Sequence, residues 1–250
     1  MTTARVAFVT GANRGLGREI CRQLAARGYE VLLGSRDPER GRVAAADIAA
    51  AGGACHAVTL DVTDAAQIAE IAADVDQRYG RLDVLVNNAA ILNDLGVDPT
   101  ATDEAVLRQN LDVNFVGPFM LTAALAPPLR RSDAGRVLNL GTQVGSFGNL
   151  TDPDSPLIDD ICRAYQASKI ALNAATALFA KELRADGVTV NSACPGWVMT
   201  DMGHDDLPDY GDAVAPMSPS DAVEQLLWLL DDEATTPTGG FWSLGEQVSW

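Results

Sequence analysis

Short runs of apolar residues alternate along this chain with longer segments whose apolar residues recur at helical spacing. Several runs are nearly continuous, such as Val84-Leu85-Val86. Continuous runs are typical of strands that are covered on both faces in a parallel sheet. The pattern predicts seven strands, at residues 6–10, 30–34, 54–60, 82–87, 136–140, 188–192 and 240–244.

Amphipathic helices are predicted between these strands, and Leu16, Ile20 and Leu24 mark the first of them. The others span residues 64–79, 103–125, 165–184 and 220–230, and Pro127-Pro128 is expected to end the helix of residues 103–125. The alternation predicts an α/β fold: a doubly wound (Rossmann) parallel seven-stranded sheet with helices on both faces, in three α/β/α layers. No repeat or linker interrupts it, so residues 1–250 are predicted to form a single domain.

Two segments break the alternation. Residues 148–163 are polar and contain Pro153 and Pro156, and residues 200–219 contain five Asp and three Pro. Loops of this length in a compact domain are usually functional or disordered. We therefore interpret residues 148–163 as an insert and residues 200–219 as a substrate lid.

Composition excludes several classes of protein. With 47% hydrophobic and 21% charged residues the chain is not disordered, and no run approaches the ~20 apolar residues of a membrane span. The first residues lack the features of a signal peptide, so a cytoplasmic protein is expected. The net charge of −16 repels a phosphate backbone, so nucleic acid is not an expected partner. An anionic ligand would require a local cluster of Arg.

The cysteines and histidines form no recognisable site. The four cysteines lie far apart in the sequence, form no CxxC motif and have no His at the spacing of metal ligands. They are Cys21, Cys55, Cys162 and Cys194. Neither a metal site nor a disulfide framework is predicted, and buried, inert thiols are expected instead.

The first chemical motif follows the first strand. Thr10-Gly11-Ala12-Asn13-Arg14-Gly15-Leu16-Gly17 leads directly into the first helix. Glycines permit a tight turn, a close approach of the backbone to phosphate and close packing of helix on strand, and the helix N-terminus attracts an anion. An ordinary glycine turn is the alternative, but the strand before it and the helix after it favour a dinucleotide phosphate site.

The end of the second strand discriminates between the two nicotinamide cofactors. NAD-specific sites place Asp or Glu there to bind the ribose 2′-hydroxyl. This chain has Ser35 and Arg36 at that point, and Asp37 comes two residues late. Arg36 and Arg14 could bracket a 2′-phosphate, which suits guanidinium geometry, although exposed Arg is also common. We therefore predict NADP(H) in preference to NAD(H).

A candidate reaction centre opens the helix of residues 165–184. Tyr165-Gln166-Ala167-Ser168-Lys169 places Tyr165 and Lys169 on one helix face. An ammonium close to a phenol favours the phenolate and lowers the phenol pKa, so this Tyr could transfer a proton near neutral pH. A Tyr at a helix start beside a solvated Lys is the alternative for an isolated YxxxK.

Further polar residues follow other predicted strands. Asn87-Asn88-Ala89-Ala90 comes after the fourth strand, Asn139-Leu140-Gly141-Thr142 ends the fifth, and Pro195-Gly196-Trp197-Val198-Met199-Thr200 follows the sixth. Asn114 lies in the middle of a long helix, where Asn is disfavoured, which indicates a structural or catalytic role. Open α/β sheets bind ligands at the carboxyl ends of their strands, so these residues are expected to share one site.

Together these motifs resemble the short-chain dehydrogenase/reductase family over essentially the whole chain, in the order and at the spacing of that family. TGANRGLG, Ser35-Arg36-Asp37, PGWVMTDM and Pro237-Thr238-Gly239-Gly240-Phe241 are most similar to its NADPH-dependent carbonyl reductase branch. The resemblance implies reversible hydride transfer between a nicotinamide and a small carbonyl or secondary alcohol substrate. It implies Tyr165 as proton donor, Lys169 as the residue that lowers its pKa and holds the nicotinamide ribose, and Asn114 as the support of a water relay.

The resemblance also implies a dinucleotide-binding domain with a defined set of cofactor residues. Asp61 and Val62 would lie beside the adenine, and residues 195–200 would hold the nicotinamide. The full set of cofactor residues is Gly11, Asn13, Arg14, Gly15, Leu16, Gly17, Ser35, Arg36, Asp61, Val62, Asn88, Ala89, Ala90, Tyr165, Lys169, Pro195, Gly196, Val198 and Thr200.

The chain departs from the family at the end of the fifth strand. The family usually has Ser-Ser there, with the second Ser catalytic, whereas this chain has Gly141-Thr142. We assign the substrate hydroxyl to Thr142, and Ser146 fits less well. The longer spacing from Thr142 to Tyr165 creates the insert, which could cover helix faces that relatives use in tetramers or lie over the substrate cleft. A monomer and a homo-oligomer are both left open.

Apolar and acidic residues near the expected site bear on the class of substrate. Phe147, Trp197, Met199 and Met202 are candidates for an apolar pocket, although each could equally be core. Acidic residues in the insert and lid would disfavour anionic substrates if they ring the entrance, which favours a neutral or cationic, fairly apolar ketone, aldehyde or secondary alcohol. These acids are Asp152, Asp154, Asp159, Asp160, Asp201, Asp205, Asp206, Asp209 and Asp212.

Two other functions are compatible with the fold. Gly141-Thr142 leaves open a family member recruited for dehydration, epimerisation or cyclisation. A non-catalytic NADP-sensing protein is the second alternative, because a fold alone does not define function. A sensor has no need of the Tyr165–Lys169 pair, which this chain retains.

Overall fold

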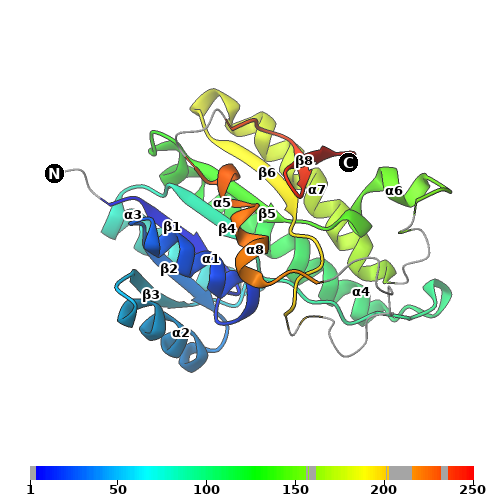
Figure 1. The fold of residues 1–250 in the computed structure, drawn as a ribbon, viewed down its shortest axis with the longest axis horizontal. Helices are drawn as coiled ribbons and strands as arrows, with labels where there is room; N and C mark the ends of the chain where they lie inside the picture. Colours follow the sequence, from blue (N-terminus) through cyan, green and yellow to red (C-terminus); the bar gives the residue numbers. More distant parts are fainter. Residues whose placement is uncertain (1–3, 156, 158–161, 201, 203–215, 232–235) are drawn as a thin grey trace.

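A single twisted sheet forms the centre of the molecule (Figure 1). The computed structural model describes residues 4–155, 157, 162–200, 202, 216–231 and 236–250. The strand order is β3-β2-β1-β4-β5-β6-β7-β8, and every pair is parallel except β7 with β8. The strands are β1 Val6–Val9, β2 Glu30–Ser35, β3 Ala54–Thr59, β4 Val84–Asn87, β5 Arg136–Leu140, β6 Thr189–Cys194, β7 Phe241–Ser243 and β8 Glu246–Val248.

Helices cover both faces of the sheet, as the continuous apolar runs predict. In β1, Ala7 and Val9 pack in one core cluster and Val6 and Phe8 in the other. The first cluster includes residues of α1, α2 and α8, and the second includes residues of α3, α5 and α7. The predicted doubly wound fold is confirmed. The helices are α1 Gly15–Ala26, α2 Pro38–Ala50, α3 Ala65–Tyr79, α4 Glu104–Leu111, α5 Gly117–Arg130, α6 Phe147–Thr151, α7 Arg163–Leu183 and α8 Pro219–Glu224.

The sheet has eight strands rather than the predicted seven. The missed strand, β8, forms a hairpin with β7 through the two-residue loop Leu244-Gly245, whose φ angles are 52° and 84°. A loop with two positive φ angles normally carries Asn, Asp or Gly at its first position. Because the first position is Leu244 and not one of these residues, the sequence does not predict the hairpin.

Helix α2 was also missed, although its start is well defined. The Asp37 carboxylate accepts hydrogen bonds from the backbone N–H groups of Glu39 and Arg40, both at 3.0 Å, and Pro38 is the first helical residue. The buried face of α2 contains Gly41, Ala44, Ala45 and Ile48. Three of these four side chains are very small, so the apolar period is weak.

The predicted helix of residues 103–125 is two α-helices joined by one π-helical turn. The turn spans Asp112–Val116 and lies between α4 and α5. Pro127 and Pro128 do not end α5, which continues to Arg130. Leu129 is completely buried, so packing of the last turn on the sheet outweighs the lost hydrogen bonds.

The two predicted loops are only partly described. The first residues of the segment 148–163 belong to α6 and its last residue, Arg163, begins α7. Of the predicted lid, Thr200, Met202 and residues 216–219 are described. Asp159, Asp160, Asp201, Asp205, Asp206, Asp209 and Asp212 lie outside the described residues. The predicted helix of residues 220–230 is α8, followed by the 3₁₀ turn Leu227–Leu229.

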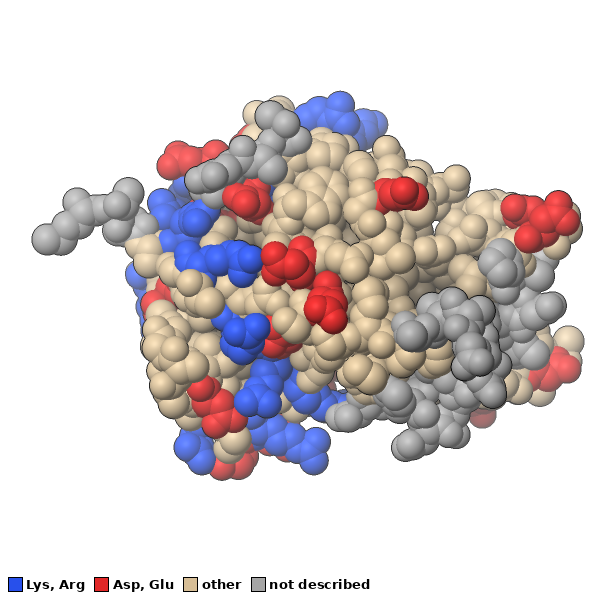
Figure 2. All heavy atoms as spheres, viewed as in Figure 1, with Lys and Arg blue, Asp and Glu red and all other residues tan. Residues whose placement is uncertain are grey.

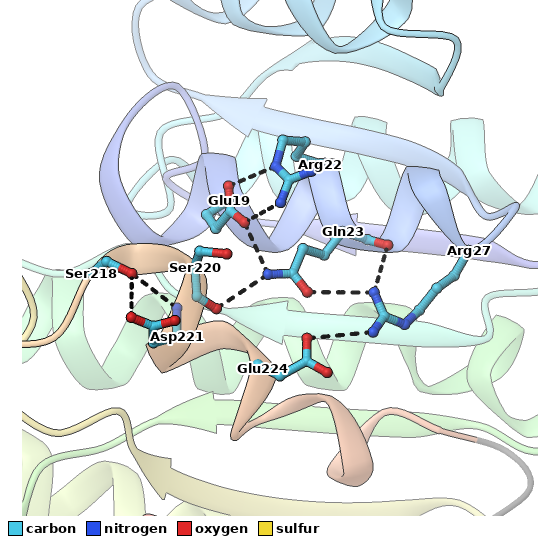
Figure 3. Close-up of polar contacts among 8 residues, drawn as sticks. All are labelled: Glu19, Arg22, Gln23, Arg27, Ser218, Ser220, Asp221 and Glu224. Carbon is cyan, nitrogen blue, oxygen red and sulfur yellow. Dashed lines mark hydrogen bonds and ion pairs between the residues drawn. The ribbon is translucent and has the colours of Figure 1, made fainter.

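Polar side chains join α8 to α1, as Figure 3 shows. The buried Gln23 amide donates to Glu19 Oε1 at 2.9 Å and to Ser220 O at 3.3 Å. An ion pair of 3.7 Å between Arg27 and Glu224 lies beside them. The hydrogen bond from Arg22 lowers the pKa of Glu19. These contacts hold α8, which follows the predicted lid, against the helix that begins at the glycine turn.

No helix in the described part of the chain is both long and apolar enough to cross a membrane.

Candidate active site

The glycine turn between β1 and α1 is held by the segment that follows β4. Asn88 Nδ2 donates to Thr10 O at 2.7 Å and to Gly11 O at 3.1 Å. Thr10 Oγ1 accepts from the backbone N–H groups of Asn88 and Ala89, both at 3.0 Å. Gly11 has a φ of 62°, and a Cβ there would lie 2.8 Å from Ala89 Cα. The hydrogen bonds to Asn88 and Ala89 therefore fix the conformation of the glycine turn without a ligand.

Helix α1 begins without a side-chain cap. Asp37, Asp64 and Asp103 cap α2, α3 and α4, whereas Arg14 is the N-cap residue of α1 and provides no such bond. The first N–H groups of a helix have no intrahelical acceptor, and the helix dipole makes that end positive. A phosphate group at this end would supply the missing acceptors.

A hollow of about 280 Å³ lies beside this helix start, between α1 and α2. Figure 2 shows Lys and Arg side chains gathered on the left of the view, over these two helices, despite the negative charge of the whole chain. Three of the lining residues are Arg. The lining consists of Asn13, Arg14, Arg18, Glu39, Arg40, Val43, Ala44 and Asp47.

Two predicted cofactor residues at the end of β2, Ser35 and Arg36, do not line the hollow, and Arg36 was one of the two Arg predicted to bracket the 2′-phosphate. Ser35 is buried and its hydroxyl donates to Asp37 O at 2.7 Å. Arg36 is exposed at the end of β2. Arg40, in the first turn of α2, lines the hollow together with Arg14. The sequence prediction missed Arg40 because it did not include α2.

The predicted adenine and nicotinamide segments follow β3 and β6, which lie on opposite sides of β1 in the strand order. Asp61 Oδ1 accepts from Thr63 N at 3.0 Å, and Val62 is buried against Gly117. After β6, Val198 forms a backbone bridge with Met217, and Gly196 has a φ of 78°. A Cβ on Gly15 would have Thr200 as its nearest neighbour, at 3.4 Å. Thr200 thus brings the segment 195–200 to the phosphate turn.

Tyr165 and Lys169 share one face of α7, as their spacing predicts. Lys169 Nζ lies 5.6 Å from the centroid of the Tyr165 ring and donates to Leu140 O at 2.8 Å. Lys169 is 3% exposed, so its ammonium is held inside the molecule at the end of β5. The acidity of both groups follows from this burial.

Burial lowers the pKa of Lys169 to about 8. Burial also raises the pKa of Tyr165, and Cys194, Cys162 and Asp94 raise it further. The phenol pKa in this structure therefore lies above its ordinary value, whereas the sequence predicts a lowered one. The difference arises because loss of water disfavours the phenolate, and the Lys169 ammonium is bound to Leu140 O rather than to the phenol oxygen.

Asn114 lies in the π-helical turn, completely buried. Its Oδ1 accepts from Ile91 N at 2.8 Å, and its Nδ2 donates to Ile91 O at 2.9 Å and to Ser168 Oγ at 3.0 Å. π-Helical turns are rare and frequently occur at functional sites. Asn114 thereby joins the segment after β4 to α7, one residue from Lys169.

In the loop after β5, Thr142 is the N-cap residue of the 3₁₀ turn Gln143–Gly145, and its side chain makes no cap hydrogen bond. Ser146 is buried, and its hydroxyl donates to Ser249 O at 3.0 Å and accepts from Asn149 N at 3.1 Å. Thr142 is therefore the better candidate for a substrate hydroxyl than Ser146.

The four residues predicted to line a substrate pocket are all at least partly accessible. Phe147 is 60% exposed, Met199 47% and Met202 40%, and Trp197 is half-buried. They are therefore not plain core residues, although the hollow described above does not include them. The four cysteines are free and buried.

The sequence matches the short chain dehydrogenase family over residues 5–211. The chain belongs to this family. A galactitol 2-dehydrogenase from Agrobacterium fabrum is 37% identical over 195 residues, which are 78% of this chain and 70% of that enzyme. A 3-alpha-(or 20-beta)-hydroxysteroid dehydrogenase from Mycobacterium tuberculosis is 33% identical over 240 residues, 94% of this chain and 85% of that enzyme.

Solved structures of similar proteins extend over the whole chain. The structure of an NADPH-bound carbonyl reductase from chicken fatty liver superposes on this short-chain dehydrogenase with a TM-score of 0.84. The two chains are 26% identical, and the match covers 99% of each.

The structure explains why this short-chain dehydrogenase has Gly141 where the family usually has Ser. A Cβ on Gly141 would lie 2.5 Å from Ser192 Oγ, 3.2 Å from the Phe241 ring and 3.3 Å from Asn173 Oδ1. Ser192 Oγ donates to Asn173 Oδ1 at 2.7 Å, and Asn173 Nδ2 donates to Gly145 O at 3.1 Å. The side chains of Ser192 and Asn173 therefore occupy the space that a side chain at position 141 would need. Through Gly145 O, Asn173 also holds the loop that carries Thr142.

Proposed function

We propose that this short-chain dehydrogenase is an NADP(H)-dependent carbonyl reductase that acts on small ketones, aldehydes or the corresponding secondary alcohols. The observation that carries the proposal is the Tyr165–Lys169 pair, with Lys169 held at the end of β5, just before Thr142. The NADPH-bound carbonyl reductase with the same fold supports the choice of reaction and cofactor.

The cofactor fits the residues present at the glycine turn. The uncapped start of α1 provides backbone N–H groups for the pyrophosphate, and Arg14 and Arg40 line a hollow suited to a 2′-phosphate. Asn88 holds the turn, and Thr200 reaches Gly15 from the segment that would flank the nicotinamide. When bound, NADPH supplies the hydride that the carbonyl carbon receives.

The residues of this chain act on the carbonyl oxygen. The hydroxyl of Thr142 and the phenol of Tyr165 donate hydrogen bonds to it, where negative charge develops during reduction. Tyr165 then gives its proton to that oxygen. A phenol whose pKa is raised by burial remains protonated at neutral pH, which suits the acid in the reductive direction. Lys169 holds the end of β5 beside Tyr165 through Leu140 O. Asn114 holds the segment after β4 against α7 by binding Ile91 and Ser168.

The proposal is tested by NADPH oxidation across a panel of neutral ketones and aldehydes, each paired with a keto acid of similar size. Turnover of neutral carbonyls faster than of the keto acids is expected. NADPH binding without turnover of any carbonyl would contradict a carbonyl reductase, and the absence of NADPH binding would contradict the cofactor assignment as well.

Cofactor preference is expected to depend on Arg40. Arg40→Ala should raise the KM for NADPH by about 10- to 100-fold and leave the KM for NADH unchanged, because one charged hydrogen bond to phosphate contributes about 1.5–3 kcal/mol. Arg22→Ala is the matched control, since Arg22 lies on α1 and pairs with Glu19, and neither of these two residues lines the hollow. Equal effects of the two variants on NADPH would reject the 2′-phosphate site.

Thr142→Val keeps the shape of the side chain and removes its hydroxyl. The kcat for reduction is expected to fall by about 100-fold, the typical cost of one donor to a developing oxyanion, with NADPH affinity unchanged. Steady-state kinetics and a fluorescence titration of NADPH check the two parts. A rate near that of the wild type would reject the role of Thr142.

A further inference from the structure

A buried carboxylate that the sequence did not indicate lies at the start of α7. Asp94 belongs to the segment between β4 and α4 and is 1% exposed. Its Oδ2 accepts hydrogen bonds from Ala164 N at 2.6 Å and from Tyr165 N at 3.4 Å, and its Oδ1 accepts from Tyr165 N at 3.3 Å. Asp94 thus binds the backbone of Tyr165 itself, across 71 residues of sequence.

Helix α7 has no side-chain cap of its own. Cys162 is the N-cap residue and its side chain makes no cap hydrogen bond, so Asp94 supplies the cap from another segment. A carboxylate is also favoured at this end of a helix by the helix dipole. Among the described residues, no Lys or Arg forms an ion pair with Asp94. Backbone N–H groups and the dipole therefore compensate its buried charge.

The segment that carries Asp94 is itself braced. Asn114 binds both backbone groups of Ile91, and Asn93 Oδ1 accepts from Asn110 Nδ2 at 2.5 Å. The carboxylate is therefore attached to a fixed support on α4 and the π-helical turn. A fixed support is what a residue needs in order to determine the position of a neighbouring helix.

We propose that Asp94 is a positioning residue for Tyr165: it fixes the first turn of α7 and places a buried carboxylate at the start of the helix that carries the phenol. The catalytic part of this role rests on the proposed function, because it requires Tyr165 to be the acid. The structural part, the cap on the backbone of Ala164 and Tyr165, does not.

The direction of the electrostatic effect follows from the groups that face Tyr165. They are Lys169 on the same helix, the thiols of Cys162 and Cys194, and Asp94. Burial is the main cause of the raised phenol pKa, and Asp94 contributes in the same direction. Neutralising Asp94 therefore lowers the pKa of Tyr165. Because reduction uses the protonated phenol, the alkaline fall in kcat should then begin at a lower pH.

The test compares Asp94→Asn with Asp98→Asn. Asp98 lies in the same segment and is also a cap, accepting from Thr100 N at 2.7 Å, but it is exposed and caps a 3₁₀ turn. The alkaline limb of kcat is expected to move to lower pH in Asp94→Asn, because the carboxylate of Asp94 raises the phenol pKa. It should stay in place in Asp98→Asn. A limb that does not move in Asp94→Asn would overturn the electrostatic role.

Hydrogen exchange provides a readout that does not depend on activity. The backbone amides of Ala164 and Tyr165 should exchange at least tenfold faster in Asp94→Ala than in the wild type, and at the wild-type rate in Asp98→Ala. If Asp94→Ala does not fold, the same two amides are measured in Asp94→Leu, which fills a similar space but has no acceptor, and faster exchange is again expected. Unchanged exchange would overturn the cap. If the wild type reduces no carbonyl, the proposed function fails while this measurement still judges Asp94.

Discussion

Tyr165→Phe is expected to lower kcat for carbonyl reduction by about 1000-fold, within the range typical of the loss of a general acid. The phenyl ring preserves the packing beside Lys169, and Asp94 binds the backbone of α7 rather than the phenol. The variant should therefore fold normally and bind NADPH with unchanged affinity. Stopped assays of NADPH oxidation and a fluorescence titration of NADPH measure the two quantities.

Tyr79→Phe is the matched control for this prediction. It removes a phenol oxygen from the last residue of α3, at the opposite end of the sheet from the glycine turn. Its kcat should equal that of the wild type. A Tyr165→Phe enzyme that keeps a tenth or more of its activity would show that another group supplies the proton.

Gly17→Ala is expected to abolish tight NADPH binding. A Cβ at Gly17 would lie 2.4 Å from Asn88 Nδ2 and 2.9 Å from both Ala12 Cα and Gly11 O. The methyl group would push Asn88 away from the turn that it holds, and overpacking of this kind costs about 1–3 kcal/mol of stability. The Kd for NADPH, measured by fluorescence or calorimetry, should rise at least tenfold.

Gly28→Ala separates loss of stability from loss of the site. Gly28 has a φ of 83°, and no atom lies within 4 Å of a Cβ built there. The substitution should cost about 1–2 kcal/mol of stability through backbone strain and leave the Kd for NADPH unchanged. Equal losses of NADPH affinity in Gly28→Ala and Gly17→Ala would mean that the turn at Gly17 has no special role.

The arrangement of strands could be predicted because this sheet is buried on both faces. Each central strand must then be a short apolar run, and the runs are visible without knowledge of their partners. The positions of Asn88, Asn114, Tyr165 and Lys169 followed from their places at strand ends or on one helix face. The structure brings Asn88 to the glycine turn and Asn114 to α7.

Features that depend on partners distant in sequence could not be predicted. Asp94 is an ordinary loop residue until the start of α7 is placed over it. Arg40 lines the hollow because it lies in the first turn of α2, and the sequence did not reveal α2 because this helix buries mainly Ala and Gly. The need for Gly141 depends on Ser192 and Asn173, which lie on other elements. The raised pKa of Tyr165 likewise reflects burial, which spacing alone does not reveal.

The π-helical turn Asp112–Val116 holds one more residue than a regular α-helix would place between α4 and α5. Such a turn takes up an extra residue because its i→i+5 hydrogen bonds enclose more residues per turn than the 3.6 of an α-helix. Deleting one residue within it should restore a regular α-helix and leave Leu121, Leu125 and Leu129 buried against the sheet. The change would be confined to the position of Asn114, which binds Ile91 and Ser168. The extra residue therefore serves the active site and not the packing of the core.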